Sequence, residues 1–182
     1  MQKDNIKLLL WEFEQLTEAV NTNQFKKINV SKLENFFLNT LPKYPDIAAD
    51  LLPKIDTLSI QLTRGLNKIS ISEKSVRDDI LCCIVLLNAI LGKEKKVAEL
   101  ISDVQAKKID GINNDFVINK LYNYMEKGGK LAHSNKIWSK LLHSYNRGEK
   151  TAIKGQSEKV KSMLTQEKKK GRLQRIKDFL GI

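Results

Sequence analysis

The sequence predicts an all-α protein: a multi-helix bundle around a central apolar helix at about residues 73–91, followed by a basic C-terminal helical extension. Apolar residues recur at steps of three and four along nearly the whole chain, which is the helical period. The run from Ile80 to Leu91 is apolar except for Asn88, as in a helix surrounded by others. Residues 126–182 hold 15 Lys and Arg against 5 Asp and Glu, whereas residues 1–125 hold 17 against 16.

Composition favours a folded protein of a reducing compartment. The chain has 182 residues and is 41% hydrophobic, enough for a substantial core. Cys82 and Cys83 are adjacent within an apolar run, so we expect two buried thiols rather than a disulfide or half of a metal site. No apolar stretch approaches the roughly 20 residues that a membrane span needs, and no signal peptide is visible, so we expect a cytoplasmic protein.

The first half of the chain predicts three helices. Apolar spacing predicts the first helix before the polar residues 21–24. Ser31 and Glu34 form a capping-box pattern that opens a short second helix, and Pro42 and Pro45 end it. Pro53 is expected in the first turn of the third helix, which continues to about residue 68.

The second half predicts further helices separated by short breaks. Residues 69–72 alternate like a strand but lack a partner, so they are interpreted as a linker with Ser72 capping the central helix. Gly92 ends that helix, and helices at 93–108 and 115–127 follow. The pair Gly128-Gly129 predicts a boundary between a near-neutral core, residues 1–127, and a basic extension, residues 130–182, which could also pack on the core as one domain. Helices are expected at about 135–147 and 157–170, with a final segment at 172–180.

Motifs of catalysis are absent from the sequence. It contains no Walker loop, dinucleotide-binding glycine pattern, HExxH, CxxC, serine elbow or kinase motif. The only two histidines, His133 and His143, are ten residues apart. We therefore expect no enzyme activity and no cofactor or metal, although an active site assembled from scattered residues would escape this search.

The predicted helix at 135–147 has one face made of basic side chains. Lys136, Lys140, His143 and Arg147 fall within about 60° on a helical wheel and form a row about 16 Å long, here called the basic stripe. No Asp or Glu occurs from residue 127 to residue 148, whereas a solvated helix face usually mixes both signs. A polyanion would relieve the repulsion within such a row. The rival interpretation is an ordinary surface helix in a lysine-rich protein.

The opposite face of that helix is apolar. Ile137, Trp138, Leu141, Leu142 and Tyr145 form this arc. Trp138 and Tyr145 could stack on bases of a single strand, but their place on the apolar face favours packing in the core.

Residues 166–182, here called the C-terminal basic segment, predict an amphipathic helix with a narrow apolar row. Three roles fit this pattern: binding to anionic lipid, docking on a partner protein or on the chain's own core, and contact with phosphates. We favour docking with the cations turned toward nucleic acid, because the apolar face is small for membrane binding alone. The docking residues are Leu173, Ile176, Phe179 and Leu180.

Charge and spacing together predict a non-enzymatic protein that binds the DNA or RNA backbone, as an accessory subunit of a larger nucleoprotein complex with other protein subunits. The alternative is an adaptor or inhibitor whose basic tail docks on an acidic partner or a membrane surface. Lysine-dominated surfaces suit phosphate contact more than base reading. The predicted nucleic-acid contacts are Lys130, Lys136, Lys140, His143, Arg147, Lys150, Lys154, Lys168, Lys169, Lys170, Arg172 and Arg175.

Overall fold

The computed structural model describes the backbone of residues 2–148 and the side chains of residues 7–148. This part of the chain contains seven α-helices and no strand, which confirms the all-α prediction. The helices and short helical turns are α1 (Gln2–Asn21), η1 (Phe25–Lys27), α2 (Val30–Glu34), η2 (Asn35–Thr40), η3 (Leu41–Lys43), α3 (Pro45–Leu66), α4 (Lys74–Ile90), α5 (Glu94–Gln105), α6 (Asn114–Ser134) and α7 (Lys136–Asn146).

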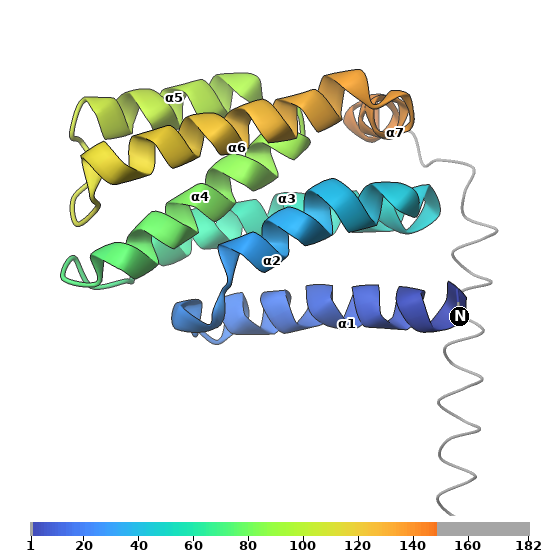
Figure 1. The fold of residues 1–182 in the computed structure, drawn as a ribbon, viewed down its shortest axis with the longest axis horizontal. Helices are drawn as coiled ribbons and strands as arrows, with labels where there is room; N and C mark the ends of the chain where they lie inside the picture. The colour runs from blue at the N-terminus through green and yellow to red at the C-terminus, as the bar shows by residue number, and fades with distance from the viewer. Residues whose placement is uncertain (1, 149–182) are drawn as a thin grey trace, which may run out of the picture.

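The helices pack into one body. In Figure 1, α5 and α6 lie along one edge, α1 lies along the opposite edge, and α3 and α4 lie between them. Helix α4 packs against α2, α3, α5 and α6, and α7 packs against α3 and α6. Each residue from Ile80 to Leu91 is at most 4% exposed, which explains why this stretch is apolar on every side.

The adjacent thiols lie deep in this packing. Cys82 and Cys83 are both free and buried. Burial raises the pKa of the Cys82 thiol to about 12 and raises that of Cys83 as well. Since the thiolate is the reactive form of cysteine, these side chains act as small core residues.

One proline prediction needs correction. The short helical stretch ends at Lys43, just before Pro45, as expected, and Pro45 occupies the first turn of α3, where its missing N–H costs nothing. Pro53, expected in that first turn, lies inside α3, which continues through it to Leu66. An internal proline costs about 3 kcal/mol of helix stability, but α3 buries ten residues along one face, and that burial outweighs the local cost.

Two helix caps also differ from the prediction. Asn29, not Ser31, caps α2, because its side chain accepts a 3.0 Å hydrogen bond from the N–H of Lys32. Helix α4 begins after Glu73 without a side-chain cap, and Ser72 instead hydrogen-bonds Ser70 within the linker. The linker itself is confirmed, since residues 69–72 belong to neither a helix nor a strand and include a turn at residues 71–72.

The predicted helix end at Gly128-Gly129 is wrong. Helix α6 runs through both glycines to Ser134. Beyond it, Trp138 and Leu142 of α7 belong to the same hydrophobic cluster as the residues of α3 and α4. The rest of the predicted basic extension, including the helix at 157–170 and the C-terminal basic segment, lies outside the described residues.

Within the described part of the chain, no helix is both long enough and apolar enough to cross a bilayer. The same residues contain no group of three or more His, Cys, Asp or Glu side chains placed to hold a metal ion.

Candidate nucleic-acid interface

Helix α7 forms where the sequence predicts it, because both of its ends carry local stop signals. Asn135 caps the start, its side-chain oxygen accepting hydrogen bonds from the N–H groups of Ile137 (3.1 Å) and Trp138 (3.0 Å). Gly148, with a φ of +65°, follows the last turn in the left-handed conformation that glycine adopts readily. The helix therefore has defined ends at residues 136 and 146.

The inner face of α7 is fixed to the core by Trp138. Its side chain is 1% exposed, and its indole N–H donates a 2.8 Å hydrogen bond to the main-chain oxygen of Ile90 at the C-terminal end of α4. At that end of α4, the main-chain N–H of Lys93 donates to the oxygen of Asn88 and that of Gly92 donates to the oxygen of Ala89. The main-chain oxygen of Ile90 is therefore available to Trp138. Trp138 is thus a core residue, as its position on the apolar face predicts.

A second anchor connects the end of α7 to α3. The hydroxyl of Tyr145 donates a 3.0 Å hydrogen bond to Oδ2 of Asp56, and the Lys93 ammonium forms an ion pair with Oδ1 of the same carboxylate. Burial raises the pKa of Asp56, but the hydrogen bonds from Lys93 and Tyr145 outweigh it and hold that pKa below its ordinary value. Burial and the Asp56 carboxylate together raise the pKa of Tyr145.

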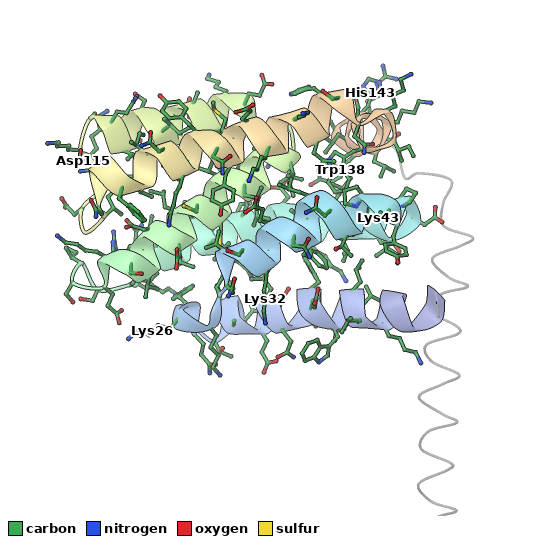
Figure 2. All side chains as sticks on the ribbon, in the orientation of Figure 1. Lys26, Lys32, Lys43, Asp115, Trp138 and His143 are labelled. Carbon is green, nitrogen blue, oxygen red and sulfur yellow. The ribbon has the colours of Figure 1, made fainter. Side chains whose placement is uncertain are left out.

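These anchors leave the basic stripe on the outer face. Lys136, Lys140, His143 and Arg147 are all exposed. Figure 2 shows His143 projecting from the outer side of α7, while Trp138 lies toward the bundle. None of the ion pairs among the described side chains uses Lys136, Lys140 or His143.

The helical wheel predicts burial wrongly for one residue of the apolar arc, Ile137. Ile137 is 54% exposed, because it lies at the edge of the arc and the contacts of α7 with α3 and α6 cover only the middle. Trp138 and Leu142 are buried there, and Leu141 and Tyr145 pack partly against the core.

The structure separates the remaining predicted contacts. Lys130 is exposed on α6 rather than on α7. Lys150, Lys154 and the predicted contacts of the C-terminal basic segment lie outside the described residues, as do the docking positions from Leu173 to Leu180.

Sequence reasoning missed the polar group beneath α7. Asp56 lies 89 positions before Tyr145, so no local spacing connects the two. The available signal was chemical: a tyrosine on an apolar helix face needs a partner for its hydroxyl when it is buried.

The site is therefore a helix with two polar anchors on its inner face and a row of exposed basic side chains on its outer face, in a stretch of sequence, residues 127–148, that contains no Asp or Glu. Such an arrangement can contact an extended anion such as a phosphate backbone. Comparison of the chain with family models, with curated proteins and with solved structures finds no significant match.

Proposed function

We propose that this protein binds the backbone of DNA or RNA through the basic stripe of α7, without catalysing a reaction, as an accessory subunit of a nucleoprotein complex. The observation that supports this most directly is the exposure of all four stripe residues on one helix. The cations Lys150, Lys154, Lys168, Lys169, Lys170, Arg172 and Arg175 belong to the same proposal.

The stripe has an energetic cost that a binding role explains. Lys136 and Lys140 are four residues apart on one helix face, where a pair of like charges destabilises a helix by roughly 0.2–0.5 kcal/mol. The helix tolerates this repulsion because Trp138 and Tyr145 fix its other face to the core. A phosphate backbone would turn the same repulsion into a favourable contact.

The aromatic residues of α7 favour backbone contact over base stacking. Trp138 is buried, and Tyr145 packs partly against the core while its hydroxyl donates to Asp56, so we expect neither ring to stack on a base. Single-strand binding proteins combine basic grooves with exposed aromatic platforms. We therefore expect α7 to bind through charge, with little dependence on base sequence.

A charge-reversal pair tests this proposal. The variant Lys136→Glu/Lys140→Glu removes two stripe cations, and Lys54→Glu/Lys74→Glu makes the same charge change at exposed positions of α3 and α4. Binding to a labelled duplex is measured by fluorescence anisotropy at several salt concentrations. The stripe variant should lose affinity, and its slope of log affinity against log salt should become shallower by about 1.8, since each phosphate contact contributes about 0.9.

The two double variants have the same net charge, so general attraction to a polyanion affects them equally. An equal loss of affinity in both double variants would show that the basic stripe is an ordinary solvated helix face and not a binding site. A wild-type chain that shows no salt-dependent binding to DNA or RNA at all would contradict the proposed function itself.

A further inference from the structure

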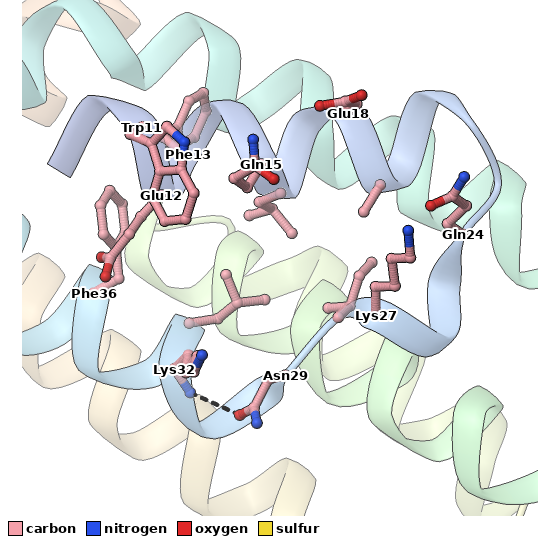
Figure 3. A pocket seen from close by; sticks show the side chains of 14 residues that line it. Trp11, Glu12, Phe13, Gln15, Glu18, Gln24, Lys27, Asn29, Lys32 and Phe36 are labelled. Carbon is pink, nitrogen blue, oxygen red and sulfur yellow. Dashed lines mark hydrogen bonds between the residues drawn. The ribbon is translucent and has the colours of Figure 1, made fainter. Parts of the chain in front are cut away.

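A groove of about 330 Å³ lies between α1 and the segment formed by η1 and α2 (Figure 3). Buried apolar side chains from both sides line it, among them Phe13, Leu16, Ile28 and Leu33. Trp11 also lines the groove, yet it is 55% exposed. An apolar groove beside an exposed tryptophan marks a surface suited to a protein partner.

The two sides of the groove carry opposite charges. Four charged residues line it, and all four are exposed: Glu12 and Glu18 on α1, Lys27 on η1 and Lys32 on α2. Among the described side chains, none of these four forms an ion pair. The α1 side of the groove is therefore acidic, and the side formed by η1 and α2 is basic.

The acids and the bases also lie at matching positions along the groove. Figure 3 shows Glu12 and Lys32 toward one end. Glu18 and Lys27 lie toward the other end of the same view. A complementary partner therefore has one acidic side and one basic side, each with a charge at both ends. The groove itself has this pattern.

We propose that the partner is a second copy of this chain, paired groove to groove about a two-fold axis that runs along the groove. Rotation by 180° about this axis keeps each position along the groove and exchanges its two sides. Glu12 of one copy then lies opposite Lys32 of the other. Glu18 likewise lies opposite Lys27, so each of the four charges meets its opposite.

A two-fold axis across the groove would also bring the two grooves together, but the charges oppose it. That rotation leaves the acidic side over the acidic side and reverses the direction of the groove. Glu12 would then face Glu18 of the second copy, and Lys27 would face Lys32. Like charges that face each other across an interface disfavour the contact strongly. The charge pattern therefore selects the axis along the groove.

The same orientation brings apolar side chains together at one end. Trp11 and Phe36 both lie at the Glu12 end of the groove, Trp11 on α1 and Phe36 on η2 after α2 (Figure 3). After the rotation, Trp11 of each copy lies on the Phe36 side of the other. Leu8, 56% exposed and one helical turn before Trp11, extends this apolar surface along α1. The contact thus has an apolar centre with charges beside it, as protein interfaces do.

The face is large enough for a modest dimer. Helix α1 has 20 residues and is about 30 Å long, and two helical segments side by side are about 20 Å wide. Each copy therefore presents roughly 600 Å², at the lower end of what a specific interface needs from each partner. We accordingly expect a dimer that dissociates on dilution.

This inference goes beyond the proposed function, because the pairing needs no nucleic acid. A dimer would carry two basic stripes. The test contains only the protein, so its failure is distinguishable from a failure of nucleic-acid binding.

Light scattering and sedimentation over a concentration series test the pairing in the full chain. The mass of the wild type should rise from 20.8 kDa toward twice that value. Glu12→Lys/Glu18→Lys makes both sides of the groove basic, and Lys27→Glu/Lys32→Glu makes both sides acidic. Each variant alone should lose at least about tenfold in its association constant, because like charges then face each other.

Mixing these two double variants tests the complementarity directly. A groove with two basic sides matches a groove with two acidic sides, so an equimolar mixture should form the heterodimer. The control Glu99→Lys/Glu126→Lys makes the same charge change as the basic variant at exposed positions of α5 and α6. It should dimerise like the wild type.

The apolar part of the contact has its own matched pair. Trp11→Ser should weaken the dimer by at least about tenfold, as expected for a tryptophan at the centre of an interface. Phe116→Ser removes an equally exposed aromatic side chain from α6 and should leave the dimer unchanged. The far-ultraviolet circular dichroism of each variant verifies that the bundle is folded.

Three results would overturn the inference. The first is a wild-type chain that stays monomeric at every concentration. The second is a dimer that forms equally in both groove variants, because another face then makes the contact. The third is a pair of groove variants that lose self-association but do not associate when mixed, because the loss then has a cause other than complementary charge.

Discussion

Gly128 of α6 and Ala89 of α4 meet where these two helices cross. A Cβ added to Gly128 would lie 2.6 Å from the Cβ of Ala89 and 3.1 Å from the N of Ile90, closer than packed atoms tolerate. The next residue, Gly129, has nothing within 4 Å of the same position. The glycine pair therefore contains one residue required by helix packing and one with free space around it.

We predict opposite effects for two alanine substitutions in this pair. Gly128→Ala should lower the free energy of unfolding by about 1–3 kcal/mol, since α4 and α6 must move apart to admit the methyl group. Gly129→Ala should raise it by about 0.4–1 kcal/mol, because alanine reduces the freedom of the unfolded chain and favours the helix. Urea denaturation measures both. Similar changes for the two variants would contradict this account of the crossing.

A second prediction concerns Arg77 on α4, which is 5% exposed. Its guanidinium donates hydrogen bonds to the main-chain oxygens of Leu66 and Ile69, both at 2.7 Å, and of Asp110 at 3.1 Å. One side chain thus joins the end of α3, the linker before α4 and the loop before α6.

Arg77→Met should destabilise the fold by about 3 kcal/mol or more, since a hydrogen bond from a charged group contributes roughly 1.5–3 kcal/mol. Arg77→Lys should be intermediate, because an ammonium cannot reproduce the planar fork of donors. The exposed Arg64 is the control, and Arg64→Met should change stability by no more than about 0.5 kcal/mol. Denaturant midpoints compare the three variants. Equal midpoints for Arg77→Met and Arg64→Met would show that the three hydrogen bonds of Arg77 do not stabilise the fold.

The third prediction is a pH dependence from Asp56. Its pKa is lower in the folded chain than the ordinary value of 3.8, so the folded state favours the carboxylate. Its contribution to stability is therefore complete above pH 3.8 and is lost as the pH falls through the lower folded value.

Asp56→Asn should lower the free energy of unfolding by about 1–2 kcal/mol at pH 7. This is the contribution of a charge-assisted hydrogen bond, reduced because the site is partly exposed. The difference from the wild type should shrink below about pH 4, where the wild-type carboxylate is also neutralised. Thermal unfolding of both chains from pH 3 to pH 7 measures this. A difference that stays constant over that range would show that the Tyr145 and Lys93 contacts do not depend on the charge of Asp56.

Local spacing in the sequence determined the all-α class, the ends of α7 and the exposure of the basic stripe. These features depend on the helical period and on residues such as Asn135 and Gly148 that act within one turn, so the order of residues is sufficient. The burial of Trp138 followed from the same periodicity.

Tertiary packing alone decided the rest. Pro53 and Gly128 look like helix breakers in the sequence, but burial along α3 and the close crossing of α4 and α6 keep both inside helices. The hydrogen bond of Arg77 to Asp110 and the contact of Asp56 with Tyr145 join residues far apart in the chain. Spacing cannot encode such contacts, because they depend on the distance between helices after folding.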